Sequence, residues 1–123
     1  MNSSDIEQVL HWLNDQNEDI LLSMVVSSDG LPLCHYGDAA DCDQTGALYI
    51  ELKLICDRVL AGLAIGPLEH IFVHAKQGCV DILPIDDLGV LACMGRPGIN
   101  SRKLQLHAWR AVSSLRKVMA ELL

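Results

Sequence analysis

The sequence has few aromatic residues, few basic residues and no long apolar run. Only 4% of its 123 residues are Phe, Trp or Tyr, so its core must consist mainly of aliphatic side chains. Nine Lys and Arg stand against 16 Asp and Glu, which gives a formal charge of −7 at pH 7. This shortage of cations argues against nucleic-acid binding, which needs clustered Lys and Arg to displace counterions from phosphates. We therefore expect no nucleic-acid partner.

Membrane and secretion signals are also missing from the sequence. No apolar run approaches the roughly 18 residues that a membrane-spanning helix needs. The polar start, Met1 to Asp5, lacks the cationic and apolar regions of a signal peptide. These absences lead us to expect a cytoplasmic protein without a membrane span.

The cysteines do not have the spacing of a disulfide framework or of a zinc site. Their number is odd, and no two are arranged as Cys-x-x-Cys. Several have apolar neighbours, among which a free thiol behaves as a small hydrophobic group. The five are Cys34, Cys42, Cys56, Cys79 and Cys93. We expect reduced core thiols, as in proteins of a reducing compartment.

Residues with catalytic or metal-binding chemistry are present, but not in a specific pattern. His70 and His74 share one face of a predicted strand, yet they are too far apart along it to bind one ion unaided. Asp38, Asp41 and Asp43 lack the ligand and glycine pattern of a calcium loop, so a solvated loop is the simpler interpretation. No phosphate-binding P-loop motif is present. We predict no catalytic residue, metal or cofactor. A Cys-His nucleophile pair is an alternative without a local signature.

The length allows one domain, residues 1–123. A chain of this size supports a single hydrophobic core, and no linker or internal repeat divides it. Half of the residues are apolar, which is more apolar surface than one small core obviously buries.

Apolar periodicity predicts the order helix, strand, strand, helix, strand, strand, strand, helix. Asp29-Gly30 predicts a tight hairpin turn after the first strand, because these residues tolerate positive φ, and Pro32 places the second strand at a sheet edge. The predicted helices span residues 4–16, about 43–66 and 101–122, and Asn100 caps the last one. The predicted strands span residues 20–27, 31–36, 68–75, 79–85 and 88–94. This order indicates the α/β (α+β) class, with helices covering one mixed or antiparallel sheet.

The middle helix has two apolar stripes, whereas a helix on the outside of one sheet needs one. At about 100° per residue, one stripe contains Leu48, Leu52, Ile55, Val59 and Leu63, and the other contains Ile50, Leu54, Ala61 and Ile65. Glu51 and Arg58 lie in one gap between the stripes, and Lys53 and Asp57 lie in the other. Either the helix is sunk deeply into its own domain, or its second stripe contacts another chain. Because only two other helices could cover it, we prefer self-association.

The strand after this helix lacks the features that usually protect a sheet edge. The segment His70 to His74 has no Lys and no Pro. A symmetric dimer is the simplest closed arrangement that covers both this strand and the second stripe. The predicted interface residues are Ile50, Leu54, Ala61, Ile65, His70, Phe72 and His74.

Three segments together resemble a known family. They are Ile20 to Leu33 with the string Ser-Asp-Gly-Leu-Pro-Leu, the two-faced helix ending at Gly66, and the strand through Leu91-Ala92-Cys93-Met94. In this order they are similar to the Roadblock/dynein light chain family, over essentially the whole chain and most of all to its stand-alone prokaryotic members, such as the gliding-motility GTPase regulator. The resemblance implies a profilin-like, three-layer fold with an antiparallel five-stranded sheet. The first and last helices would cover one face and the middle helix the other, with dimerisation through the middle helices and third strands.

The resemblance also implies a function. Members of this family are adaptors and regulators without catalytic machinery, and many bind small Ras-like GTPases. We therefore expect a homodimeric, non-catalytic adaptor that docks on a small Ras-like GTPase and modulates its nucleotide state. The expected docking residues are Glu51, Lys53, Asp57 and Arg58. The alternative is a structural scaffold subunit of a signalling or motor complex, which pairs with another Roadblock-like chain without affecting GTP hydrolysis. The chain departs from the family in an extended last helix with five cations, Arg102, Lys103, Arg110, Arg116 and Lys117.

Overall fold

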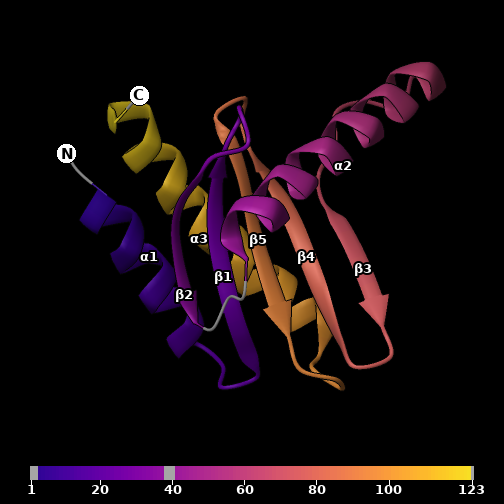
Figure 1. Ribbon diagram of the computed structural model, residues 1–123. Helices are drawn as coiled ribbons and strands as arrows, with labels where there is room; N and C mark the ends of the chain where they lie inside the picture. Colours follow the sequence, from indigo (N-terminus) through magenta and orange to yellow (C-terminus); the bar gives the residue numbers. More distant parts are fainter. Residues whose placement is uncertain (1–2, 38–40, 123) are drawn as a thin grey trace.

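A computed structural model describes residues 3–37 and 41–122 and has three layers, with one sheet between two layers of helices (Figure 1). Helices α1 and α3 cover one face of the sheet and α2 lies on the other. The elements are α1 (Ser3–Asp15), β1 (Ile20–Ser27), β2 (Pro32–Gly37), α2 (Cys42–Leu63), β3 (Ile71–Ala75), β4 (Gly78–Ile85), β5 (Gly89–Gly95) and α3 (Ser101–Leu122). The predicted fold class and the predicted order of elements are confirmed.

The five strands form one antiparallel sheet in the order β2-β1-β5-β4-β3. Strand β2 lies at one edge, as Pro32 predicted, and Pro32 is paired with Val26 at the start of that strand. Strand β3 lies at the other edge and pairs only with β4 among the described residues. The sheet therefore has two different edges, and α2 connects the strands that form them.

The turn between β1 and β2 differs from the expected tight turn. Positive φ occurs at Gly30, at +90°, and not at Asp29. The Gly30 N–H donates to the Ser27 carbonyl and the Ser27 N–H donates to the Leu31 carbonyl, both over 2.9 Å. These bonds close a three-residue loop with glycine in the left-handed position, which is the next most common hairpin connection after two-residue turns.

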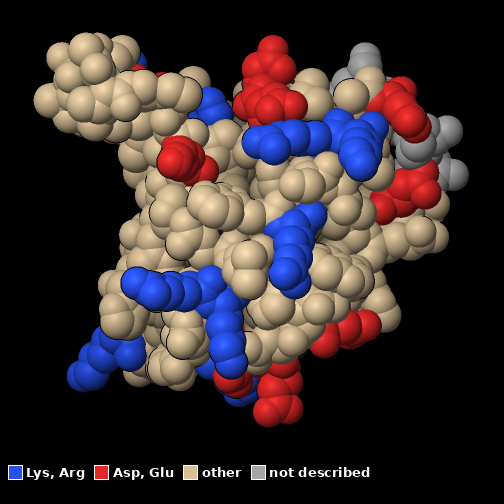
Figure 2. All heavy atoms as spheres, turned by 180° about the vertical axis from the view of Figure 1, so that it is seen from behind, with Lys and Arg blue, Asp and Glu red and all other residues tan. Residues whose placement is uncertain are grey.

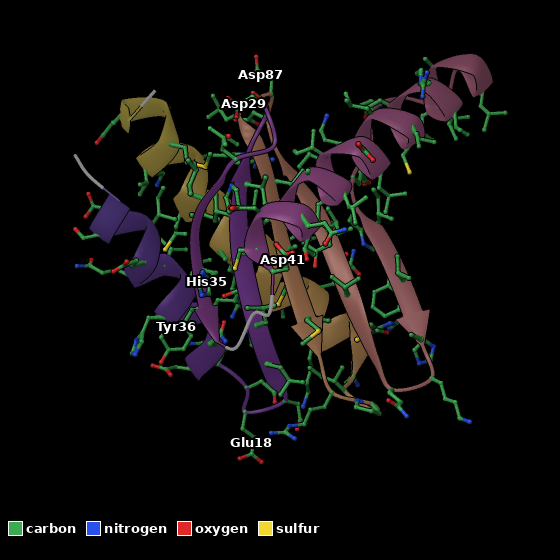
Figure 3. All side chains as sticks on the ribbon, in the orientation of Figure 1. Glu18, Asp29, His35, Tyr36, Asp41 and Asp87 are labelled. Carbon is green, nitrogen blue, oxygen red and sulfur yellow. The ribbon has the colours of Figure 1, made fainter. Side chains whose placement is uncertain are left out.

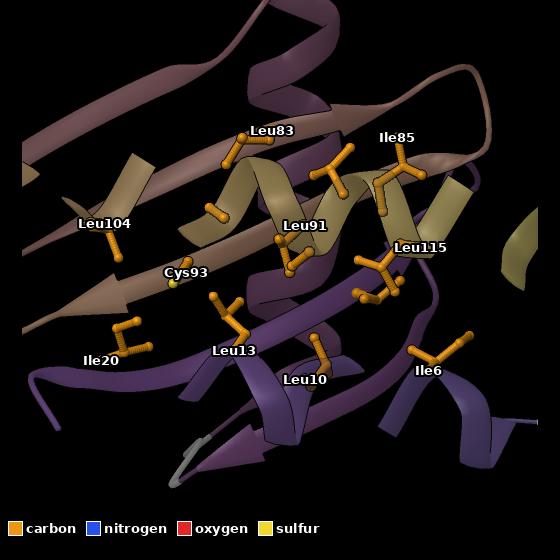
Figure 4. Close-up of a cluster of buried hydrophobic side chains, with 14 of the residues drawn as sticks. Ile6, Leu10, Leu13, Ile20, Leu83, Ile85, Leu91, Cys93, Leu104 and Leu115 are labelled. Atoms are coloured by element: carbon orange, nitrogen blue, oxygen red, sulfur yellow. The ribbon is translucent and has the colours of Figure 1, made fainter. Parts of the chain in front are cut away.

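The larger core lies between the sheet and helices α1 and α3 (Figure 4). It is aliphatic, as the low aromatic content predicted, and its central side chains are fully buried. These include Ile6, Leu10 and Leu13 of α1, Leu104 and Leu115 of α3, and Leu91 of β5. A second, smaller core lies between the sheet and α2. The helix on that face is therefore held by fewer buried side chains.

Two helix ends test the predicted boundaries. Asn100 caps α3 as expected, because its Oδ1 accepts from the backbone N–H groups of Arg102 and Lys103 at 3.0 and 3.1 Å. Helix α2 ends earlier than Gly66, with Ala64 in the left-handed conformation at φ 55°. As a result Ile65, which we assigned to the helix, lies beyond it. Strand β3 also begins at Ile71 and not at Leu68.

Candidate interaction surface on α2 and β3

The first turns of α2 are fixed to the sheet. Asp41 is the N-cap, and its side chain accepts from the Gln44 N–H at 3.1 Å (Figure 3). Capping of the helix accounts for the Asp41 carboxylate without a bound cation. Asp38 of the same predicted loop lies outside the described residues. Gly46 lets the helix approach β1 and β2, because a Cβ there would lie 3.2 Å from Pro32 and 3.4 Å from Val26. The start of α2 is therefore anchored closely over the β1–β2 edge.

The second half of α2 leaves the sheet and projects beyond it (Figure 1, upper right). Ile50 is the last buried residue of the helix. Leu52 and Leu60 are partly buried, but the other large apolar side chains that follow Ile50, together with one that precedes it, are about half exposed or more. They are Leu48, Leu54, Ile55, Val59 and Leu63 of α2, with Ile65 after the helix, and we call this set the α2 apolar surface. An isolated helix with apolar side chains on two flanks normally requires a further covering layer.

Ile50 does not have the interface role that the second stripe predicts for it. Its side chain is only 7% exposed and packs in the chain's own smaller core with Met24 and Ile82. Ile50 therefore has little surface left for a partner, since the helix rests on the sheet at this position. Periodicity identified two apolar stripes, but it could not tell that Ile50 of the second stripe touches the sheet.

Strand β3 has an unpaired edge and an apolar side chain on each face. Ile71 packs in the smaller core on the α2 side of the sheet, and Val73, two residues on, is exposed on the same side. Phe72 and His74 face the other side, with ring centroids 6.3 Å apart. No Lys or Pro occurs within β3. Such an edge is open to pairing with another strand.

A partly buried polar link fixes the approach to β3. His70 Nδ1 lies 2.8 Å from Asp81 Oδ1, and His70 Nε2 lies 3.1 Å from the side-chain nitrogen of Gln105. An amide nitrogen donates, so Nε2 accepts and Nδ1–H donates to Asp81. Asp81 is 0% exposed, and burial raises its pKa although the hydrogen bond from His70 opposes this shift. The link joins the residue before β3 to β4 and α3.

The sequence interpretation missed this link. It treated His70 as an interface residue and made no prediction for Asp81. The available signal was a single acidic residue within the apolar run Cys79 to Leu83, because a charge in a buried strand needs a partner. Its partner could not be identified from sequence, since it depends on how the 64–70 connection meets β4.

The four predicted docking residues form two groups on α2. Lys53 Nζ and Asp57 Oδ2 are 2.7 Å apart and form a partly buried ion pair along one side of the helix. Glu51 and Arg58 are exposed and seven residues apart, so they lie on the same side of the helix, away from that pair. Of these four residues, Lys53 and Asp57 pair with each other, whereas Glu51 and Arg58 remain available to a partner.

The five cysteines are all free, but only Cys79 and Cys93 are the buried core thiols that we expected. Burial raises the pKa of Cys93 to about 12 and that of Cys79 as well, so both thiols stay protonated at neutral pH. Cys42 Sγ lies 3.5 Å from Nδ1 of His35, at the surface beside β2 (Figure 3). Within residues 3–37 and 41–122, no three His, Cys, Asp or Glu side chains form a group that could hold a metal ion. None of the described helices is long and apolar enough to cross a membrane.

Comparison with known proteins identifies the fold. No family model and no curated protein sequence matches the chain. Among solved structures, MglB of Myxococcus xanthus superposes with a TM-score of 0.90 at 13% identity, covering 98% of this chain and 92% of that one. A Roadblock/LC7 domain from Streptomyces avermitilis gives a TM-score of 0.81 at 18% identity, covering 92% and 96%.

A chain of the LokiProfilin1/rabbit actin complex is also similar, with a TM-score of 0.65 at 18% identity, covering 94% of this chain and 96% of that one. The chain therefore has the fold of the stand-alone Roadblock-like proteins, and its three-layer arrangement is profilin-like. The resemblance that the sequence suggested is confirmed at the level of the fold.

Proposed function

We propose that the chain is a homodimeric, non-catalytic adaptor that docks on a small Ras-like GTPase and modulates its nucleotide state. One observation carries this proposal: the α2 apolar surface projects beyond the sheet on the same side as the unpaired edge of β3. The similarity in fold to MglB and to a Roadblock/LC7 domain agrees with a regulatory module of this kind.

A second copy of the chain complements both surfaces at once. A two-fold axis perpendicular to the sheet at its β3 edge pairs β3 with its own copy in antiparallel fashion. The same axis carries the projecting half of each α2 toward the partner's sheet. There Val73 is exposed and Ile71 and Val80 are only partly buried, so each sheet offers apolar surface to the opposite helix.

Most of the interface residues predicted from sequence fit this arrangement. Leu54, Ala61 and Ile65 belong to the exposed end of α2 and its extension, and Phe72 and His74 belong to the β3 edge. His70 acts through its bond to Asp81, which positions the start of β3. Ile50 acts through its own core, by setting the angle at which α2 leaves the sheet. We add Val59 and Leu63 as direct contacts.

The outward side of the paired helices is the proposed platform for the GTPase. Glu51 and Arg58 are its exposed charged residues, and the Lys53–Asp57 pair stiffens the adjacent flank of each helix. Such a platform modulates hydrolysis or exchange by binding one conformation of the GTPase better than the other. The proposed setting for this interaction is the cytoplasm.

The dimer is tested by measuring mass in solution with light scattering. Leu54→Asp and Leu63→Asp should each give a monomer, because a carboxylate would be buried in the interface without a partner. Leu31→Asp is a matched control, since Leu31 is 61% exposed and Leu63 is 60% exposed, but Leu31 lies at the β1–β2 turn. A dimer mass that is unchanged in both α2 variants would contradict the proposal.

The regulatory role is tested by measuring GTP turnover of a small Ras-like GTPase from the same organism. Wild-type protein should change the turnover rate, and the double variant Glu51→Lys with Arg58→Glu should lose this effect while it remains a dimer. Binding without any change in turnover would favour the alternative, a scaffold subunit that pairs with another Roadblock-like chain.

A further inference from the structure

Helix α3 concentrates positive charge on an acidic protein. Five of the nine Lys and Arg in the sequence lie on this helix, although the chain carries a formal charge of −7. Figure 2 shows the face formed by α1 and α3, with a diagonal band of basic side chains and acidic side chains on both sides of it. This face is opposite to the one that carries α2, so its chemistry is separate from the proposed function.

Three of these cations follow a regular spacing. Lys103, Arg110 and Lys117 are seven residues apart, which places them on one side of the helix at intervals of about 10.5 Å. Leu106 lies on the same side of the helix and Trp109 on the adjoining flank, and each is 46% exposed. We call these five residues the α3 basic stripe. A spacing of two helical turns matches the repeat of another α-helix lying alongside.

The cations of the stripe are not used within the chain. In residues 3–37 and 41–122, neither Lys103, Arg110 nor Lys117 forms an ion pair, whereas the neighbouring Arg116 is 3.0 Å from Asp86. Burial, followed by the charges of Arg110 and Lys103, lowers the pKa of His107 on the same helix. The three cations of the stripe are therefore available to carboxylates outside the chain.

Carboxylates limit the width of the stripe. On one side, Asp5 of α1 and Glu121 line a groove of about 500 Å³ together with Arg110 and Lys117. On the other side, Glu69 and Asp86 lie next to Trp109 and Arg116. A flat anionic membrane or a DNA duplex would meet these carboxylates as well as the cations. A single helix is narrow enough to meet the cations alone.

We propose that the α3 basic stripe docks an acidic amphipathic helix of a partner protein. In this complex the partner places a carboxylate at every seventh residue, opposite Lys103, Arg110 and Lys117. Its apolar side chains cover Leu106 and Trp109. The described helices of this chain do not carry carboxylates at three successive positions seven apart, so a second copy does not fit this description.

The test uses a synthetic helical peptide of three heptads, with Glu once and Leu once in each heptad. Its binding is followed by the fluorescence of Trp109 in a Trp12→Phe background and by calorimetry. We expect the affinity to fall with added salt and to be at least about tenfold weaker for a matched peptide with Gln in place of Glu. The triple variant Lys103→Glu, Arg110→Glu, Lys117→Glu should lose at least about tenfold in affinity.

Two controls keep the result specific. The double variant Lys76→Glu, Arg96→Glu reverses cations away from the stripe and should change the affinity by less than about twofold. A second triple variant, Lys103→Gln, Arg110→Gln, Lys117→Gln, removes the charge of the stripe without reversing it. Circular dichroism checks that each variant is folded.

The proposal is overturned if the Glu peptide fails to bind at about 1 mM, or if reversal of the stripe leaves its affinity unchanged. It is also overturned if phosphatidylserine vesicles or a DNA duplex bind the stripe at least as well as the peptide. A change in oligomeric mass on reversal would assign the stripe to a second copy instead. The α2 variants test the dimer independently, because they leave α3 intact.

Discussion

Helices α2 and α3 each have 22 residues, yet they are held in opposite ways. Helix α3 lies along the sheet and buries six side chains, Leu104, Ala108, Ala111, Val112, Leu115 and Met119. Helix α2 buries only Gly46 and Ile50 and leaves most of its large apolar side chains in solvent. The helix with one apolar stripe satisfies it within the chain, and the helix with two does not. The number of stripes thus separates a helix whose apolar stripe is buried by its own sheet from one that keeps a stripe exposed.

The first prediction tests the buried side of this comparison. Leu115→Ala should lower the free energy of unfolding by about 2 to 5 kcal/mol, because it leaves a cavity in the main core. Leu63→Ala should cost less than about 1 kcal/mol in the monomer, since Leu63 is exposed there. Urea titration of a monomeric Leu54→Asp background measures both values. Equal losses would mean that α2 is as well packed within the chain as α3.

The second prediction tests the edge next to α2. Val73→Lys places on β3 the kind of residue that commonly blocks edge-to-edge pairing. It should weaken the dimer by about tenfold, or about 1.4 kcal/mol, while the monomer remains folded. Sedimentation at several concentrations gives the dissociation constant. A comparable substitution on the other edge is Tyr36→Lys on β2, because Tyr36 is 38% exposed and Val73 is 43% exposed. It should leave the dimer unchanged, and the opposite ranking would place the interface at β2.

The third prediction compares the starts of the two helices. Asn100→Ala and Asp41→Ala should each lower the free energy of unfolding by about 1 kcal/mol, because each removes a side chain that accepts from the first turn. Loss of the α2 cap should also weaken the dimer, whereas loss of the α3 cap should not. Thermal unfolding and solution mass check the two effects. Weakening of the dimer by Asn100→Ala alone would reverse the roles assigned to the two helices.

The fourth and smallest effect concerns the link between β3 and α3. Burial raises the pKa of Asp81 above its ordinary value of 3.8, so the folded protein binds this proton more tightly than the unfolded chain. The contribution of Asp81 to stability therefore falls as the pH rises from 3.8 through the folded pKa. Asp81→Asn removes this term and keeps an acceptor for His70. Its stability relative to wild type should thus increase with pH over that window.

Urea midpoints of both proteins, measured from about pH 4 to pH 7, check this sign. An exposed substitution, Glu121→Gln, controls for the loss of one negative charge. A stability difference that falls with pH would show that His70 stabilises the ionised form of Asp81 more than burial opposes it.

The sequence was sufficient for features that depend on local patterns. The bounds of β1, the edge position of β2 and the Asn100 cap were all predicted, because each follows from a few adjacent residues. The end of α2 was predicted too late, at Gly66, since glycine and proline together suggest a stop and Ala64 adopts a left-handed conformation that only the folded chain reveals.

The candidate surface was predictable in outline only. Periodicity identified two stripes on α2, but the burial of Ile50 depends on how closely Gly46 lets the helix approach β1. The contact between His70 and Asp81 joins residues from different elements, and its partner Gln105 comes from α3. Such contacts arise from the register between elements, which no local pattern encodes.

The sheet order also governs how the chain folds during synthesis. Strand β1 pairs with the central strand β5, where Ile20 lies opposite Gly95, so the main core cannot close before most of the chain has been made. Contacts between residues so distant in sequence carry a cost in loop-closure entropy and slow folding. A growing chain therefore holds the apolar faces of β1 and α2 open until β5 arrives. Each molecule must complete its own sheet before it can present a properly formed β3 edge to another.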